Sequence, residues 1–239
     1  MKISMKPILI SVTILAVFAS ALVHADETTQ KYTQLMEQKK GVAMSAFNKG
    51  LSYENNKEQL KAIDAYKQAI RLNPTVKEAY NNLGAIYADL GMYDKAIDEY
   101  KKAIEVDDTY SVAYFNLGMA YYALGRYPEA VTAFEKGGES SSQSKDPLYF
   151  LGRSYCHIGQ YDKSIECLEK VLAYDPEFYP AHFDAACVYM ITNKFNMALY
   201  HFHQVLLIAP QHENAERINT IIKNIEKIDL NRVELRSST

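Results

Sequence analysis

The sequence contains no tryptophan and few residues that break regular secondary structure, with 10 glycines and 7 prolines among 239 residues. This composition disfavours a β-rich fold with many turns and favours helices. Charge of one sign is not in excess either, because the formal net charge is only −3. A chain without a basic surplus lacks the driving force that counterion release gives to nucleic-acid binding. The composition therefore predicts a helical protein that does not bind nucleic acid.

The sequence also lacks the short motifs that accompany catalysis and cofactor binding. It contains no glycine-rich phosphate loop, no C-x-x-C pair and no G-x-S-x-G nucleophile turn. His201 and His203 lie two residues apart on a predicted helix, so they point to different faces and cannot share a metal ion. Cys156 and His157 are adjacent, but a zinc site would need further ligands nearby. We therefore expect no catalytic residue, no cofactor and no metal site.

The first part of the chain, residues 1–25, has the layout of a secretory signal peptide. Lysines precede an apolar run at 7–23, and the small residues Val23 and Ala25 stand at the expected cleavage positions. We expect cleavage after Ala25 and export, with the bacterial periplasm as the predicted location. Because the apolar run is close in length to the shortest helix that spans a bilayer, an uncleaved inner-membrane anchor stays open as the alternative.

The rest of the chain repeats itself. Residues 79–91 read AYNNLGAIYADLG, and residues 113–125, 34 positions later, read AYFNLGMAYYALG. At this spacing the sequence shows five consecutive copies without an insertion or deletion. One position is tyrosine in every copy, and we expect these tyrosines, Tyr121 among them, to be packing residues. The copies are 43–76, 77–110, 111–144, 145–178 and 179–212.

Each copy has the pattern of two helices joined by a short turn. In the second copy Tyr80, Leu83, Gly84 and Tyr87 have the i, i+3, i+4, i+7 spacing of one helical face. A turn at Gly91 follows, and a second amphipathic helix completes the copy. The small residue on the first helix lets the two helices cross closely.

These features resemble the tetratricopeptide repeat family, whose unit is a helix–turn–helix with the same repeat length as the copies in this chain. The first and fifth copies are degenerate, with Lys49 and Ala185 where leucine is usual. The resemblance implies an all-α fold, a right-handed α-solenoid of such units, and a non-enzymatic role in binding other proteins. The residues that match the family pattern are Tyr80, Leu83, Gly84, Tyr87, Ala96 and Tyr100 in the second copy, and Tyr114, Leu117, Gly118, Tyr121, Ala130 and Phe134 in the third.

Three segments lie outside the repeats. Residues 26–42 are polar and form a short helix or a loose lead-in. Residues 213–230 carry isoleucines at helical spacing, which predicts a capping helix over the last repeat. Residues 231–239 are expected to be a disordered tail.

One stretch departs from the repeat pattern. After Lys136 the third copy reads GGESSSQSKD, with two glycines and four serines where the other copies have a long helix. Glycine and serine lower helix propensity, so we expect this helix to end about two turns early. The stretch is interpreted either as a surface loop or as a hinge between copies one to three and copies four and five.

The first helices carry apolar residues on the face opposite to their packing face, where a helix with one buried face should be polar. In the third and fifth copies this face also includes the apolar residues Val112 and Ile191. In the second copy the matching positions are polar or small. The predicted groove residues are Phe47 and Leu51 in the first copy, Phe115, Met119 and Tyr122 in the third, Tyr149 and Arg153 in the fourth, and Phe183 and Met190 in the fifth.

In proteins of the family that this chain resembles, the matching face lines the concave groove of the superhelix, where partner peptides lie. An apolar and aromatic groove suits an apolar or aromatic segment of a partner protein. We therefore predict a scaffold of the cell envelope, with a membrane-anchored adaptor as the alternative if the signal is not cleaved. A second alternative is that the N-terminal segment or a second copy of the chain, in a homo-oligomer, covers the groove.

Some family members grip a partner's C-terminal carboxylate with lysine, arginine and asparagine on this face. At the matching positions of this sequence only Asn82 fits, and no cation is present. We therefore do not expect binding of a terminal carboxylate.

The three cysteines leave at least one thiol unpaired within a single chain. Cys156 and Cys187 fall on equivalent outer faces of adjacent first helices. Such helices lie about 8–10 Å apart, whereas a disulfide needs Cα atoms within about 7 Å. We expect free thiols. A Cys156–Cys187 disulfide is one alternative, and a thiol or metal-binding protein that uses Cys156, His157 and Cys187 is another.

Overall fold

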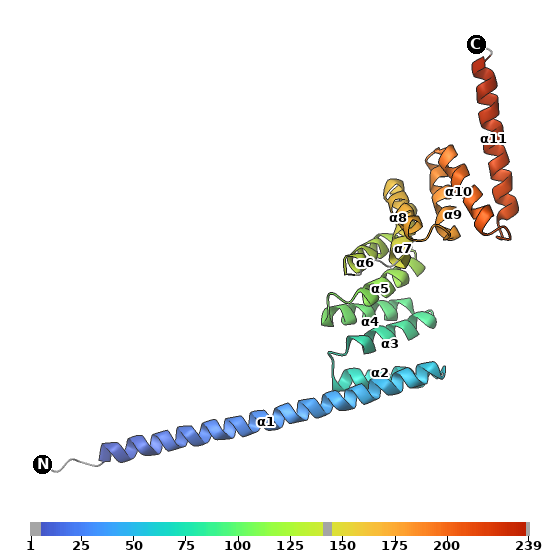
Figure 1. Ribbon diagram of the computed structural model, residues 1–239. Coiled ribbons are helices and arrows are strands. Elements are labelled where there is room, and N and C mark those ends of the chain that lie inside the picture. The colour runs from blue at the N-terminus through green and yellow to red at the C-terminus, as the bar shows by residue number, and fades with distance from the viewer. Residues whose placement is uncertain (1–5, 141–144, 238–239) are drawn as a thin grey trace. The chain divides into compact units, whose positions relative to one another are not determined.

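The computed structural model describes the backbone of residues 6–140 and 145–237, and the side chains of residues 26–138 and 145–227. Every regular element in these ranges is an α-helix, and the helices are labelled α1 to α11 in Figure 1. The predicted all-α class and α-solenoid of helical repeats are confirmed. The chain divides into two compact units, Met1–Ala79 and Tyr80–Thr239.

The first unit consists mainly of α1 (Lys6–Asn55) packed against α2 (Gln59–Leu72). The turn between them passes Lys57, whose φ of 60° lies in the left-handed region. The ring of Tyr66, which is fully buried, lies directly against Gly50, so a side chain on α1 at this point would collide with it. The glycine therefore allows the close helix crossing that the sequence predicted.

Helix α1 is continuous through the predicted signal peptide, the predicted lead-in and the first helix of the first copy. The side chains of residues 26–42 are all exposed, so this part of α1 packs on nothing within its unit. Within residues 26–138 and 145–227, no helix is long and apolar enough to cross a membrane. The apolar run at 7–23 lies outside those ranges.

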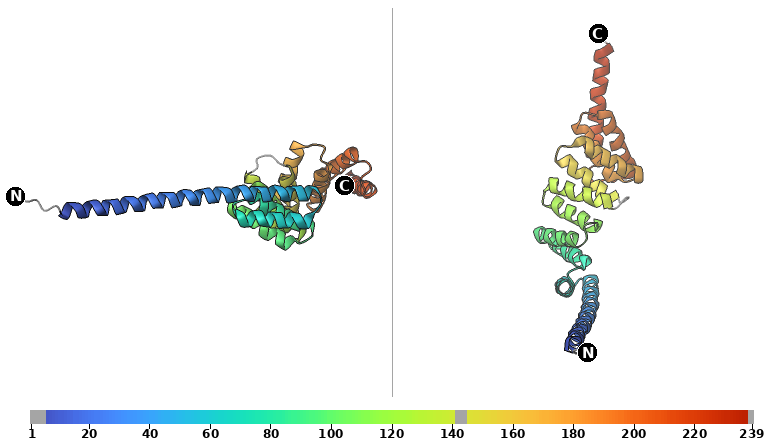
Figure 2. Two further views of the ribbon diagram at one scale, coloured as in Figure 1. Left: turned by 90° about the horizontal axis from the view of Figure 1, so that it is seen from below. Right: turned by 90° about the vertical axis from the view of Figure 1, so that its left-hand side faces the viewer.

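The second unit is a series of helix pairs in which corresponding helices begin at a constant interval, the repeat length seen in the sequence. Figure 1 shows the pairs following one another in chain order, and Figure 2 shows the same succession from two other sides. A final helix packs on the last pair. The pairs are α3 (Lys77–Asp89) with α4 (Tyr93–Val106), α5 (Ser111–Ala123) with α6 (Tyr127–Ser140), α7 (Lys145–His157) with α8 (Tyr161–Tyr174), and α9 (Tyr179–Ile191) with α10 (Phe195–Ile208), and the final helix is α11 (Ala215–Ser237).

The repeated small residues set the distance within each pair. At Gly118 an added Cβ would lie 2.5 Å from the nearest ring carbon of Phe134, and at Gly84 it would lie 2.7 Å from the ring of Tyr100. Both distances are shorter than real Cβ contacts, so only glycine lets these buried rings rest on the backbone of the neighbouring helix. Gly125 has a different role, because its φ of 71° forms the turn between α5 and α6.

The prediction that the helix of the third copy ends two turns early is wrong. α6 runs from Tyr127 to Ser140 and, like α4, contains 14 residues. Gly137 is buried, and a Cβ added to it would lie 3.1 Å from Cβ of Tyr114. Close packing of α6 on α5 thus outweighs the low helix propensity of the two glycines, which is about 1 kcal/mol each. Residues 141–144 of the same stretch lie outside the described residues.

The core continues from the third copy into the fourth. The ring of Phe134 on α6 stacks on that of Phe150 on α7, with centroids 6.2 Å apart. The hydroxyl of Tyr155 on α7 donates a hydrogen bond to Glu135 on α6. These contacts do not support the hinge interpretation, because a hinge would require a weakly packed joint here.

Helix α11 covers the end of the last pair. Ile218 and Ile222 are buried in the core formed by α8, α9 and α10. The helix continues through residues 231–237, where the sequence predicted a tail without regular structure.

Candidate functional site

The first helices of the second unit share one surface. α5 contacts α7, and α7 contacts α9, in addition to the contacts within each pair. The sides of these helices that face away from their pair partners therefore lie next to one another, and we call this surface the inner face. It contains every predicted groove residue of the second unit. The inner face is defined by Phe115, Met119 and Tyr122 of α5, Tyr149, Phe150 and Arg153 of α7, and Phe183, Asp184 and Met190 of α9.

Arg153 lies between two tyrosines and a carboxylate. Its guanidinium carbon is 5.4 Å from the ring centroid of Tyr122 and 5.7 Å from that of Tyr149. Its Nε is 3.4 Å from Oδ2 of Asp184. Cation–π contacts of this kind contribute about 0.5–1 kcal/mol when partly exposed. One side chain thus connects α5, α7 and α9.

The carboxyl group of Asp184 is the negative charge of the inner face, and its side chain is only partly exposed. Burial raises its pKa, while a hydrogen bond from Tyr149 and the charges of Arg153 and His157 oppose the rise. Burial is also the main cause that raises the pKa of Tyr149, so its hydroxyl stays protonated and can donate. Oδ2 of Asp184 is sealed from solvent and has no well-aligned hydrogen bond, although Arg153 is near. Packing, rather than ideal hydrogen-bond geometry, therefore holds the Arg153–Asp184 pair.

His157 is part of an aromatic group at the edge of the inner face. Its ring stacks on Tyr127 with centroids 3.9 Å apart, and its Nε2 is 3.2 Å from the hydroxyl of Tyr122. Burial lowers the pKa of His157, and the charge of Arg153 lowers it further. The two tyrosines therefore fix the position of the His157 ring at this edge.

The apolar residues of α5 are more involved in packing than their spacing predicted. Phe115 is half-buried, and its ring centroid lies 6.0 Å from Phe134 of its own helix pair and 6.3 Å from Phe150. Met119 packs against the same core. The expectation that these side chains point away from the packing between helices is therefore wrong for Phe115. Val112, one turn earlier, is 47% exposed.

At the other end of the inner face, Phe183 and Met190 are partly buried against the core of α8 to α11. The ring of Phe183 lies 6.3 Å from that of Phe202 on its pair partner α10 and 5.5 Å from that of His212, so the expectation that it points away from its own helix pair is wrong for Phe183 too. Ile191, the last residue of α9, is 52% exposed. The inner face is thus packed along its centre and has open apolar side chains at both ends.

Two predicted groove residues belong to the first unit. The ring of Phe47 lies 5.6 Å from Tyr66, and Leu51 is exposed. Both therefore lie on the pair formed by α1 and α2, in the first unit.

All three cysteines, Cys156, Cys167 and Cys187, are free in the structure. Burial raises the pKa of all three thiols, and it raises that of Cys187 to about 11. A reactive cysteine requires the opposite shift, because the thiolate is the nucleophile and the metal ligand. Within the described residues, no group of three or more His, Cys, Asp or Glu side chains is placed to hold a metal ion.

Sequence reasoning missed Asp184, although the repeat register contained the signal. Asp184 occupies the repeat position of Asn82, Asn116 and Phe150, and of these only Asn82 was considered as part of a carboxylate-binding site. The side-chain amide of Asn116 donates to Oδ1 of Asn81 at 2.9 Å, so this position is polar on α5 as well. Reading the whole column would have placed a carboxylate on this face of α9, whereas its contact with Arg153 required the structure.

Comparison with known proteins identifies the class to which this architecture belongs. Three tetratricopeptide repeat profiles match the chain, at residues 50–91, 75–137 and 146–178. Together the matches cover about half of the sequence, and the chain belongs to the tetratricopeptide repeat family. The family and the fold support a protein–protein interaction scaffold. A search of curated protein sequences found no match.

Solved structures share the fold over most of the chain. A crystal structure of MamA is 28% identical and covers 68% of this chain and 95% of its own, with a TM-score of 0.65. YrrB, described as a TPR protein with an unusual peptide-binding site, is 21% identical. The match covers 79% of this chain and 97% of YrrB, with a TM-score of 0.70. Pseudomonas aeruginosa pilF is 17% identical. The match covers 84% of this chain and 90% of pilF, with a TM-score of 0.65.

Proposed function

We propose that the inner face binds an apolar or aromatic segment of a partner protein, and that the protein is a non-catalytic scaffold of the cell envelope. The observation that carries this proposal is the group of Tyr122, Tyr149 and Arg153, which is half-buried in the middle of the face. Tyrosine and arginine are the residues that most often supply the binding energy of interfaces. Partial burial also fixes these side chains before binding, so less conformational entropy is lost in the complex.

The electrostatics of the inner face favour an internal segment of the partner over a chain end. Asp184 neutralises Arg153, so the centre offers no unpaired cation to a terminal carboxylate. The exposed side chains at the two ends, Val112 and Ile191, are apolar. A segment with apolar or aromatic side chains near both ends of the face would bury them together.

The proposed location rests on residues 1–25 of the sequence. Their lysines, apolar run and small residues before Asp26 have the layout of a cleaved export signal. Intact-mass measurement of the protein purified from cells tests this part. A chain that begins at Asp26 supports an exported scaffold, whereas a chain that still contains residues 1–25 would favour the membrane-anchored adaptor.

Site-specific photo-crosslinking tests the binding face. A photoreactive residue at Val112 or Ile191 should capture the same partner in cells, and one at Leu207 should not. Leu207 is the matched control, because it is 75% exposed on the second helix of the last pair. Mass spectrometry of the adducts then identifies the partner segment.

Binding of a synthetic copy of that segment completes the test. Val112→Asp and Ile191→Asp should weaken binding at least tenfold, because each places a charge against an apolar group, whereas Leu207→Asp should not. Adducts from Val112 and Ile191 that contain only this protein would mean that the chain covers its own inner face. That result would contradict the proposal.

A further inference from the structure

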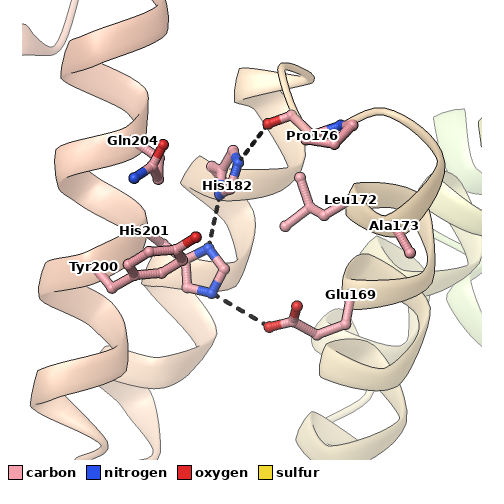
Figure 3. Close-up of a pocket in the computed structure, with 8 residues that line it drawn as sticks. All are labelled: Glu169, Leu172, Ala173, Pro176, His182, Tyr200, His201 and Gln204. Carbon is pink, nitrogen blue, oxygen red and sulfur yellow. Dashed lines mark hydrogen bonds and ion pairs between the residues drawn. The ribbon is translucent and has the colours of Figure 1, made fainter.

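A pair of buried histidines joins α9 to α10 outside the inner face. His182 and His201 are 4% and 1% exposed, and their Nδ1 atoms lie 2.8 Å apart. They line a cavity of about 310 Å³ together with residues of α8 and α10. Figure 3 shows that the two rings are the middle members of a chain that begins at Pro176 and ends at Glu169. Spacing along the sequence relates His201 only to His203, so its contact with His182 was not predicted.

The outer nitrogen of each ring faces a group that can only accept a hydrogen bond. Nε2 of His182 is 3.0 Å from the backbone carbonyl oxygen of Pro176. Nε2 of His201 is 3.3 Å from Oε1 of Glu169, and although the alignment is poor, this nitrogen is buried and has no other hydrogen-bond partner. Each Nε2 therefore carries its proton, because a lone pair at that position would face the lone pairs of an oxygen.

This assignment leaves the two Nδ1 atoms in conflict if both histidines are neutral. A neutral imidazole has one N–H, so both Nδ1 atoms would present lone pairs to each other at 2.8 Å. If either Nδ1 carried the proton in a neutral pair, the Nε2 of that ring would instead present its lone pair to the oxygen of Pro176 or of Glu169. One additional proton removes it everywhere, because all three contacts then have one donor and one acceptor.

We propose that His182 and His201 share one additional proton at neutral pH, with Glu169 as its counter-ion, and that this singly protonated pair is a proton-dependent lock between α8, α9 and α10. In the locked state His182 donates to the carbonyl of Pro176 and to Nδ1 of His201. His201 is the neutral member and donates to Glu169. Both the loss of the shared proton and the gain of a second one break the lock.

The surroundings fit a pair that accepts one proton and resists a second. The titratable groups that face it are Glu169 of α8, Tyr189 of α9 and Tyr200 of α10. Burial lowers the pKa of His201 and the adjacent His182 lowers it further, while Glu169 acts in the opposite direction. Burial raises the pKa of Tyr189 to about 12, so its hydroxyl stays a neutral donor to Glu169, at 3.1 Å.

The distance between the two nitrogens favours a proton over a metal ion. Two imidazole nitrogens on one tetrahedral Zn²⁺, with bonds of about 2.0–2.1 Å, would be separated by about 3.3 Å. The observed 2.8 Å is the length of a direct hydrogen bond. Glu169 lies beyond the far nitrogen of His201, so it could not join the same ion.

The lock has a direct structural consequence for the inner face. His182 precedes Phe183 and Asp184 on α9, so a shift of α9 away from α10 would also move Asp184 relative to Arg153 and Tyr149 of α7. Acidification would therefore loosen the centre of the inner face. This last step rests on the proposed function, whereas the shared proton does not.

Nuclear magnetic resonance of the imidazole nitrogens in the full-length protein tests the proton directly. At pH 7 we expect one ring of the pair with both nitrogens protonated, and His201 with a proton on Nε2 only. The exposed His203 serves as the internal control, because it lies outside the pair. Two neutral rings at pH 7 would overturn the proposal, and this measurement requires no variant to fold.

Variants and pH then test the lock. Because the pKa of His201 is lowered from 6.5, the unfolded chain binds more protons below about pH 6.5, and stability should fall as the pH decreases from there. Glu169→Gln removes the counter-ion and should shift the loss of the shared proton to lower pH by about one unit. The double variant His182→Leu with His201→Leu should lose this pH dependence, whereas His203→Asn should keep it.

Three outcomes would contradict the lock. An unchanged pH profile in Glu169→Gln would show that Glu169 is not the counter-ion. A melting temperature that rises with added Zn²⁺ in the wild type but not in the double variant would replace the proton by a metal ion. Weaker binding of the partner segment in acid, with neutral rings at pH 7, would leave the proposed function standing and remove the lock.

Discussion

Nε of Arg153 and Oδ2 of Asp184 lie 3.4 Å apart, and the two residues come from the first helices of consecutive repeats. Both side chains are only partly exposed, at 36% and 23%. Removing charges from water costs free energy that an ion pair recovers only with good geometry, and here the alignment is poor. The pair therefore defines the position of the two helices more than it stabilises them.

Replacement of Asp184 tests this view. Burial raises the pKa of its carboxyl group in the folded protein above the ordinary 3.8. The folded state then binds more protons than the unfolded state. The protonated Asp184 therefore contributes to stability below about pH 3.8, and this contribution is lost as the pH rises through the folded pKa. We expect Asp184→Asn to be neutral or slightly stabilising at pH 7.

Arg153→Met is the matched change on the other side of the pair. It leaves a buried carboxylate without its cation, so we expect a loss of about 1–3 kcal/mol at pH 7. Because the pKa of Asp184 would rise further, the loss should begin at the same pH as in the wild type but continue to a higher pH. The double variant Arg153→Met with Asp184→Asn should recover most of the stability. Denaturant unfolding at pH 5 and pH 7 measures these effects, and a double variant no more stable than Arg153→Met would contradict the argument.

Phe115 gives a second test, because the structure reverses the expectation from sequence. Its ring is half-buried against Phe134 and Phe150, so Phe115→Ala should cost about 2–3 kcal/mol, somewhat less than a fully buried aromatic. Tyr121→Ala, in the buried tyrosine column, should cost about 3–5 kcal/mol. Val112→Ala, on the same helix but exposed, should change stability by less than about 0.5 kcal/mol. Equal stability of Phe115→Ala and Val112→Ala would restore the original expectation of an unpacked ring.

The repeat spacing was sufficient to predict most of the fold. A constant repeat length, a glycine on the first helix and turn glycines such as Gly125 define each helix pair by local rules. The same rules failed at Gly137, because helix propensity is a weak term that the contact with Tyr114 outweighs. Predictions from propensity are least reliable where one helix packs closely on another.

The site could be predicted only in part. Helical spacing assigned Tyr122, Tyr149 and Arg153 to one face, because that depends on position along a helix. The ion pair with Asp184 and the contact between His182 and His201 depend on distances between different helices. No spacing along the chain encodes such distances, so these contacts required the structure.

Substitution of glycine by alanine is expected to have opposite effects on stability at two positions in neighbouring helices. At Gly118 a Cβ would collide with the buried ring of Phe134, so Gly118→Ala should destabilise the protein by about 1–3 kcal/mol. At Gly138 on α6 no atom lies within 4 Å of an added Cβ. Gly138→Ala should therefore stabilise the protein by about 0.5–1 kcal/mol, because alanine is the better helix former. Thermal unfolding of both variants tests the two predicted stability changes. A destabilised Gly138→Ala would show that α6 does not extend to this residue.

The cysteines provide the last prediction, which separates a scaffold from a thiol-based protein. Burial raises the pKa of Cys187 to about 11 and also raises that of Cys156. At pH 8 a thiol with a pKa near 11 is about 0.1% thiolate, compared with about a quarter for an ordinary cysteine with a pKa near 8.5. Alkylation by iodoacetamide should therefore be roughly 100-fold slower at Cys187 in the folded protein than in denaturant, where all three thiols should react at the rate of free cysteine. Peptide mass spectrometry over time assigns the rate at each position. Fast reaction of folded Cys156 or Cys187 would indicate a reactive thiol, and fewer than three alkylated cysteines in denaturant without reductant would indicate a disulfide.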